Sequence, residues 1–163
     1  IDRDGWFHTG DAGYLKDSHL YLTERIKDLF KTSNGKYISP QALETKLAID
    51  RYIDQIAVIA DERKFVSALI VPVYGFVKDY AKEKGIAYSN MDELLQHSKI
   101  QALFRARIDT LQQQFAHYEQ VKRFTLLTEP FSMERGELTN TLKLKRSVVA
   151  KNYKELIDKM YEE

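Results

Sequence analysis

The sequence predicts an α+β fold, a small mixed or antiparallel sheet flanked by helices and preceded by a β-hairpin. Two observations predict it. Short runs that alternate between apolar and polar residues, typical of strands, alternate with longer runs whose apolar residues recur at three- and four-residue steps, typical of helices. The 163 residues, of which 44% are hydrophobic, are enough for one core of ordinary size.

The first element is a hairpin over residues 13–24, with a polar turn at residues 16–18. Two strands alone are marginal in water and have no core of their own. We therefore expect residues 1–24 to be the tail of an N-terminal domain, and a chain that opens at Ile1 without Met fits a truncated start.

A second hairpin is predicted over residues 27–38, around a turn in which Asn34 and Gly35 accept positive φ. Ser39 and Pro40 then supply an N-cap and a first-turn proline, so a helix should run to about Ile49.

The centre of the domain should be a hairpin of residues 53–60 and 65–73, joined by a charged turn. Its apolar partners are helices at 74–84 and 98–120, and we expect the apolar stripe of the longer helix to be core. The remaining predicted elements are a strand at 121–129, a strand within 139–146 and a last helix at 147–161.

Composition excludes several functions. The 25 basic and 24 acidic residues leave a net charge of +1, so no overall field recruits nucleic acid or an anionic membrane. The absence of cysteine excludes disulfides, thiolate zinc sites and a cysteine nucleophile, and is compatible with a cytoplasmic protein. The four histidines show no ligand spacing, and no metal site is expected.

Three stretches carry the functional signal: FHTGD at residues 7–11, LTERIKDLFKTSNGKYISPQALE at 22–44 and GELTNTLKLKR at 136–146. In this order and spacing they resemble the C-terminal end of the adenylate-forming enzymes, and most closely of the long-chain fatty acyl-CoA synthetases. Any one motif alone would more often be an ordinary turn or an exposed basic segment.

The resemblance implies roles for the first residues of the chain. Asp11 would accept hydrogen bonds from the ribose of ATP or AMP, and charge assistance strengthens such bonds. Arg25 would contact the nucleotide. Lys27, two positions later, would be the hinge about which a mobile C-terminal domain, residues 25–163, rotates between two reactions.

The loop of residues 32–36 resembles a turn that lines the tunnel for CoA in this family, which implies contacts from Asn34, Gly35 and Lys36. Asn34 stands where relatives have glycine. Glu44, in the helix that follows, is expected to have a structural part.

In the last motif the resemblance selects Lys143 as the lysine that bridges the fatty acid carboxylate and the α-phosphate of ATP. Strand alternation would place Lys143 and Lys145 on one face and the intervening leucines on the other, and Lys145 is the competing candidate. Asn140 replaces a proline common in long-chain relatives.

The implied activity is a ligase that converts fatty acid, ATP and CoA into acyl-CoA, AMP and pyrophosphate through an acyl-adenylate. The sequence contains no phosphate loop, so the phosphate and Mg²⁺ sites should lie in the N-terminal domain, and this chain alone should be inactive. The expected partners are that domain and the small-molecule substrates, with no nucleic acid. The expected location is the cytoplasm, and peripheral membrane association stays open.

Two alternatives remain from the sequence. One is another AMP-forming carboxylate ligase of the same superfamily, because the acid pocket is not in this chain. The other is a non-enzymatic basic module that binds through residues 143–151 and the 98–120 helix.

Overall fold

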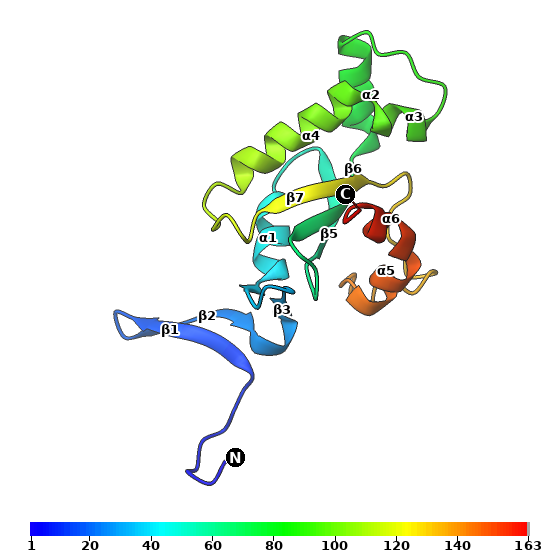
Figure 1. Cartoon of the computed structure of the whole chain (residues 1–163). Helices are drawn as coiled ribbons and strands as arrows, with labels where there is room; N and C mark the ends of the chain where they lie inside the picture. The colour runs from blue at the N-terminus through cyan, green and yellow to red at the C-terminus, as the bar shows by residue number, and fades with distance from the viewer. Residues whose placement is uncertain (163) are drawn as a thin grey trace.

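The computed structural model describes residues 1–162, with Thr23 and Glu24 described by their backbone alone. It confirms the α+β class: a three-stranded mixed sheet lies between helices, and small hairpins precede it (Figure 1). Glu163, the last residue of the predicted mobile domain, lies outside the described residues.

The elements follow one another in this order: β1 (Asp11–Lys16), β2 (His19–Arg25), a 3-10 turn (Ile26–Asp28), β3 (Phe30–Lys31), β4 (Tyr37–Ile38), α1 (Pro40–Leu47), β5 (Ile53–Ile59), β6 (Val66–Pro72), α2 (Tyr74–Glu83), α3 (Met91–Gln96), α4 (Ser98–Leu111), β7 (Val121–Leu126), α5 (Arg146–Asn152) and α6 (Lys154–Lys159).

Strand β6 is the centre of the sheet. It pairs antiparallel with β5, as the predicted core hairpin requires, and parallel with β7. All its residues are buried, and its side chains alternate between two cores: Ala68 and Ile70 face one, Leu69 and Val71 the other. The sheet is therefore covered on both faces, and β5 and β7 are its edges.

The first core lies between the sheet and α1, α2, α3 and α4, where Leu43 and Phe104 are fully or almost fully buried. The second core lies on the opposite face, under α5 and α6, and includes Leu138, Val149 and Ile157. Helix α1 starts as predicted, since the Ser39 hydroxyl accepts the Ala42 N–H at 3.4 Å.

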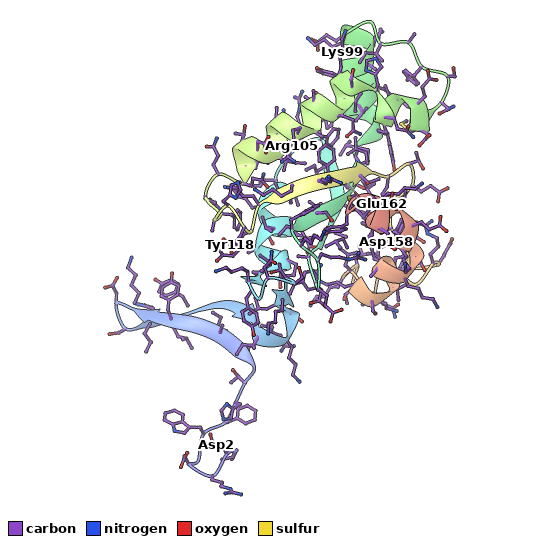
Figure 2. All side chains as sticks on the ribbon, viewed as in Figure 1. Asp2, Lys99, Arg105, Tyr118, Asp158 and Glu162 are labelled. Carbon is purple, nitrogen blue, oxygen red and sulfur yellow. The ribbon has the colours of Figure 1, made fainter. Side chains whose placement is uncertain are left out.

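The N-terminal hairpin of β1 and β2 projects away from the sheet and its helices (Figure 1). Its turn has positive φ at Asp17 and Ser18, and the rings of Tyr14 and Tyr21 stack at 5.1 Å. The residues that precede the hairpin also extend away from the sheet, and Figure 2 shows Asp2 near their end. Large apolar side chains of residues 1–22 are exposed, namely Ile1, Trp6, Phe7, Tyr14, Leu15, Leu20, Tyr21 and Leu22.

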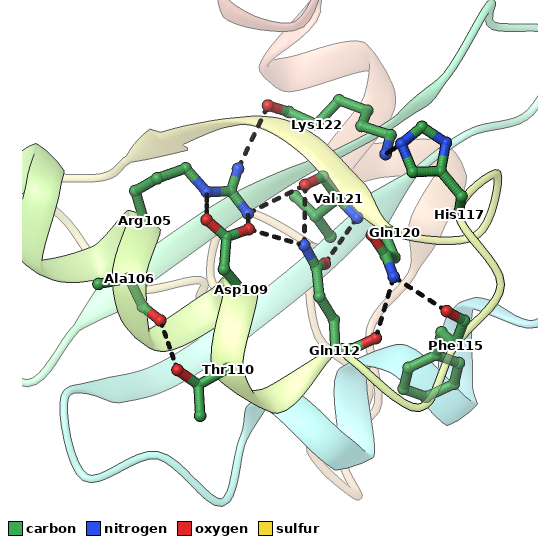
Figure 3. Close-up of polar contacts among 10 residues, drawn as sticks. All are labelled: Arg105, Ala106, Asp109, Thr110, Gln112, Phe115, His117, Gln120, Val121 and Lys122. Carbon is green, nitrogen blue, oxygen red and sulfur yellow. Dashed lines mark hydrogen bonds and ion pairs between the residues drawn. The ribbon is translucent and has the colours of Figure 1, made fainter.

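The predicted helix over residues 98–120 is too long, because α4 ends at Leu111. There the side chain of Gln112 accepts the N–H of Val121 at 2.8 Å, and Arg105 donates to the carbonyls of Val121 and Lys122 (Figure 3). These contacts fix the return of the chain into β7. The predicted core stripe is right for Phe104 and its buried neighbours, whereas Tyr118 lies beyond the helix and is exposed.

Three smaller differences concern the end of a strand, a break in a helix and a helix that was not predicted. Strand β7 stops at Leu126, and the predicted last helix is broken at Tyr153, whose ring packs edge-on against Phe131 at 5.7 Å. The prediction also missed α3, whose N-cap Asn90 accepts the N–H of Glu93, while the Glu93 carboxylate accepts the N–H of Ser89 just before the cap.

Candidate functional site

Asp11 and Arg25 meet across the N-terminal hairpin. They are register partners at the open end of β1 and β2, and the Nε of Arg25 donates to Oδ1 of Asp11 at 3.1 Å. The N–H of Ile26 also donates to the carbonyl of Gly10 at 2.8 Å, which fixes the residue before Asp11. One carboxylate oxygen is thus held by a cation, and the partly exposed group can accept further hydrogen bonds.

Lys27 lies in the 3-10 turn that separates the two hairpins. Arg25, before the turn, and Leu29, after it, are extended. The Lys27 side chain is exposed and has no hydrogen bond or ion pair with any residue that the structure describes. The connection between the N-terminal hairpin and the rest is therefore a single short turn in the described chain, as a hinge requires.

The loop of residues 32–36 is tightly built. Thr32 is buried; its N–H donates to the Lys36 carbonyl and its hydroxyl accepts the Lys36 N–H, at 2.9 and 3.1 Å. The N–H of Gly35 donates to the carbonyl of Thr32, which closes a β-turn. Only Gly35 has positive φ, so the expectation of left-handed geometry at Asn34 is wrong. The side-chain amide of Asn34 instead donates to the carbonyl of Lys64 at 3.4 Å.

A small basic cavity of about 190 Å³ opens beside this loop. Lys36 lies over the ring of Tyr118 at 5.5 Å, and Lys122 contacts His117 at 3.1 Å. The residues that line the cavity are Thr32, Asn34, Lys36, Lys64, Phe65, His117, Tyr118 and Lys122. No sequence pattern predicts this grouping, because its members come from three distant segments.

Lys143 lies in a tight turn, so the predicted strand alternation over residues 139–146 is wrong. The N–H of Thr139 donates to the carbonyl of Lys143 at 2.8 Å, and the Thr139 hydroxyl accepts the N–H of Lys143 at 3.0 Å. Leu142 has φ +60° and is 68% exposed, whereas a strand face would have buried it with Leu144. The ammonium groups of Lys143 and Lys145 are both exposed.

The turn of residues 139–143, called here the lysine turn, follows directly after a segment that contains a buried carboxylate, that of Glu137. Glu137 is 1% exposed and receives hydrogen bonds from Arg135, from the N–H of Ser132 and from Asn152, at 3.0–3.1 Å. Burial alone would raise the pKa of Glu137, but these bonds outweigh it and hold the pKa below its usual value. The Glu137 carbonyl in turn accepts the N–H of Lys145 at 2.8 Å.

Arg146 holds the other end of the lysine turn. Its guanidinium makes two bonds of 2.6 Å to the carboxylate of Glu44, on α1, and lies 5.5 Å from the ring centre of Phe30. Glu44 also accepts the N–H of Val58, on the edge strand β5, at 2.8 Å. The structural part expected of Glu44 is thus a link between α1, β5 and the start of α5.

The predicted site residues form separate groups. Asp11 and Arg25 are in contact, and Asn34, Gly35 and Lys36 share one loop, but neither group shares a hydrogen bond or ion pair with Lys143 in the described chain. Among the side chains that the structure describes, which do not include those of Glu24 and Glu163, no group of three or more His, Cys, Asp or Glu residues could hold a metal ion. None of the described helices has the length and apolar character needed to cross a membrane.

Comparison with known proteins identifies the family. The family described as the AMP-binding enzyme C-terminal domain matches residues 27–163, and the chain belongs to it. Its start at Lys27 coincides with the turn between the two hairpins.

The chain is 36% identical to long-chain-fatty-acid–CoA ligase 5 of Rattus norvegicus and 35% identical to the peroxisomal long chain acyl-CoA synthetase 7 of Arabidopsis thaliana. These matches cover 99% and 100% of the chain but 24% of each relative. The chain therefore spans about a quarter of the length of these relatives.

Solved structures of adenylation domains share the fold of this chain. The adenylation domain of a carboxylate reductase from Mycobacterium chelonae superposes with a TM-score of 0.77 at 26% identity, covering 99% of this chain and 24% of that one. A carboxylic acid reductase A domain from Segniliparus rugosus, in complex with AMP and a co-purified carboxylic acid, has the same fold, with a TM-score of 0.77 at 22% identity, covering 99% of this chain and 24% of that one.

Proposed function

We propose that this chain is the C-terminal part of a long-chain fatty acid–CoA ligase. The complete enzyme would join fatty acid and ATP to give acyl-AMP and pyrophosphate, and CoA thiolysis would then give acyl-CoA and AMP. Residues 1–24 would end its N-terminal domain and residues 25–163 would form its mobile domain. The relatives support a long-chain acid as the substrate, because they are named as long-chain enzymes and their sequences match nearly the whole of this chain.

The observation that carries the proposal is the setting of Lys143. Its ammonium is exposed on a turn whose two ends are fixed by Glu137 and Arg146, and it has no hydrogen-bond or ion-pair partner among the described residues. A cation presented in this way can stabilise the charge that develops at the α-phosphate and the attacking carboxylate. Because the backbone on either side of Lys143 is held before the reaction, less of the chain has to reorganise to bring the ammonium to the reacting groups.

The nucleotide end of the proposal rests on the Asp11–Arg25 pair. Arg25 occupies one oxygen of the carboxylate, which leaves the other to accept hydrogen bonds from a ribose diol. Arg25 is 70% exposed on its side chain and can contact a phosphate or the base at the same time. These groups fit AMP, with which the reductase A domain was solved.

The proposed contact with CoA rests on the loop of residues 32–36. Gly35 has positive φ and open space where a Cβ would lie, so a narrow pantetheine arm can approach the backbone there. Lys36 would supply positive charge beside the arm. The described residues offer no fit to Mg²⁺, so its ligands belong to another part of the ligase in this proposal.

Two half-reactions test the proposal in the complete ligase. Lys143→Ala should slow acyl-AMP formation by about 10²–10³, which is the usual cost of one electrostatic contact to a transition state. Thiolysis of supplied acyl-AMP should stay nearly normal, because rotation at Lys27 would have moved Lys143 away. Pyrophosphate release and acyl-CoA formation, followed separately, measure the two steps.

Lys145→Ala is the matched control, since Lys145 is also exposed and lies only two residues after Lys143. If Lys145→Ala gave the split and Lys143→Ala did not, the assignment to Lys143 would be wrong. The 163-residue chain alone should form no hydroxamate-trapped acyl product, and activity of that chain would contradict the division of the enzyme into two parts.

A further inference from the structure

The ion pair between Glu44 and Arg146 joins parts of the molecule that the sheet otherwise separates. Glu44 belongs to α1, which packs in the first core, and Arg146 begins α5, which packs in the second. The two residues are 102 positions apart and meet at the edge strand β5.

The contact between Glu44 and Arg146, called here the clamp, is bidentate and partly buried, unlike an ion pair on the exposed surface. Both guanidinium–carboxylate bonds measure 2.6 Å, and the two side chains are 30% and 13% exposed. Glu44 also accepts the edge N–H of Val58, so its carboxylate is held on two sides. Bidentate pairs with this degree of burial fix geometry as well as adding stability.

The clamp acts directly on the lysine turn. Arg146 follows Lys145, whose N–H donates to the Glu137 carbonyl, and Leu138 bridges Leu144 across the base of the turn. Among the described residues, the hydrogen bonds of residues 139–143 beyond this base are internal ones that involve Thr139. A change in the position of Arg146 therefore moves the base on which Lys143 stands.

We propose that Glu44 and Arg146 are positioning residues for acyl-adenylate formation: their clamp on the edge of β5 holds the lysine turn where Lys143 can reach the reacting groups. This rests on the function proposed above. It also makes a connection that the motifs do not state, because Glu44 lies on the helix that follows the loop of residues 32–36 and Arg146 stacks on Phe30 of the same hairpin. The two functional loops are thereby fixed to one another.

The first test uses the 163-residue chain and needs no catalysis. Arg146→Gln should speed amide exchange at Thr139, Lys143 and Lys145 by about tenfold or more beyond any change in global stability, since a lost charge-assisted bond is worth that factor. Arg107→Gln is the matched control: Arg107 binds Asp50 at 2.6 Å, is 34% exposed and lies over the ring of Tyr52. It should lower the unfolding free energy comparably and leave exchange in the lysine turn unchanged.

The second test uses the complete ligase. Arg146→Gln should lower kcat for acyl-AMP formation by about 10²-fold with little change in the KM for ATP, because a small misplacement of a catalytic group costs that much. Arg146→Lys, which keeps the charge, and Glu44→Gln, which keeps an acceptor for Val58, should be intermediate. Thiolysis of supplied acyl-AMP should stay near the wild-type rate in every variant.

The outcomes separate the two proposals. If wild-type ligase forms acyl-AMP but Arg146→Gln and Arg107→Gln lose the same activity in proportion to stability, the clamp is merely structural and the inference is wrong. Unchanged exchange in the lysine turn of Arg146→Gln would also overturn it. If the wild-type protein forms no acyl-AMP while exchange responds as expected, the proposed function fails, and the catalytic role of the clamp fails with it.

Discussion

Glu137 shows how a single buried carboxylate can support a neighbouring exposed turn. A carboxylate that is 1% exposed is costly unless every acceptor site is used, and here Arg135, Ser132 and Asn152 donate to it. Its backbone carbonyl also receives the N–H of Lys145. The hydrogen bonds to the Glu137 carboxylate thus offset the free-energy cost of burying it, and the Glu137 backbone supports the base of the lysine turn.

Glu137 should make the stability of the domain sensitive to acid. Its folded pKa is lowered, so its contribution is present above the unfolded pKa of about 4.3 and is lost as the pH falls through the folded pKa. Urea unfolding of the wild type and Glu137→Gln between pH 7 and pH 3 measures this. The variant should be less stable at pH 7 by about 1–3 kcal/mol and its stability should fall less on acidification.

Equal slopes for the two proteins across that pH range would show that Glu137 does not titrate in the way its contacts imply. Glu134→Gln provides the comparison, because Glu134 is an exposed acid three residues away in the same loop. We expect it to change neither the stability at pH 7 nor the acid dependence measurably.

At the scale of elements, α4 joins the first core to β7. Its buried residues Ile100, Phe104 and Ile108 hold it on the sheet, and Arg105 and Gln112 bond to the backbone of Val121 and Lys122 (Figure 3). Because these side chains occupy carbonyls of an edge strand, they also reduce its availability for pairing with other chains. The end of the helix and the start of the strand are thus one structure.

Phe104→Ala should destabilise the domain by about 3–5 kcal/mol, since the ring is fully buried and meets Tyr52 edge-on at 6.1 Å. Tyr118→Ala should cost less than about 1 kcal/mol, because Tyr118 is exposed beyond the helix and its ring meets Lys36 only at the surface. Chemical denaturation gives both values. Similar losses in the two variants would mean that the apolar stripe continues through Tyr118 as a helix.

At the scale of the whole molecule, the described chain has a hairpin that projects from a compact sheet-and-helix body (Figure 1). The body has two hydrophobic cores, whereas the hairpin has exposed apolar side chains. We therefore expect the hairpin to pack against another domain. The 3-10 turn at Ile26–Asp28 connects the two parts. A rotation there would carry the lysine turn and the loop of residues 32–36 together.

Lys27→Pro tests the hinge in the complete ligase. Proline fixes φ near −65° and disfavours a helical residue before it, so the turn would lose the freedom to change conformation. We expect acyl-AMP formation to persist and CoA thiolysis to collapse, the reverse of the Lys143→Ala pattern. The two half-reactions are measured separately, with thermal unfolding as a check on folding.

Lys27→Ala is the control, since it removes the ammonium and leaves the backbone free. Both steps should then change only mildly. Equal loss of both steps in the proline variant would argue against a hinge at this residue, and a severe thiolysis defect in the alanine variant would show that the ammonium itself contacts CoA.

The fold class, the central hairpin, the cap of α1 and the family could all be predicted from the sequence. These depend on local patterns: alternation in β5 and β6, a serine before a proline at residues 39 and 40, and motifs within short windows. The sequence also selected Asp11 and Arg25, which flank the predicted hairpin of residues 13–24, but their contact is a finding of the structure, in which the strands extend to both residues and pair them at 3.1 Å. Their proposed roles in binding and catalysis remain predictions.

Three features could not be predicted from local patterns: the end of α4, the turn at residues 139–143 and the contact of Glu44 with Arg146. Each depends on a contact between distant residues, such as Gln112 with the N–H of Val121 or Glu44 with a guanidinium 102 positions later. Periodicity continues through residue 118 because it records apolar spacing and contains no information about which backbone groups a side chain will meet. Long-range hydrogen bonds therefore set the ends of the elements, and they fix the base on which Lys143 stands.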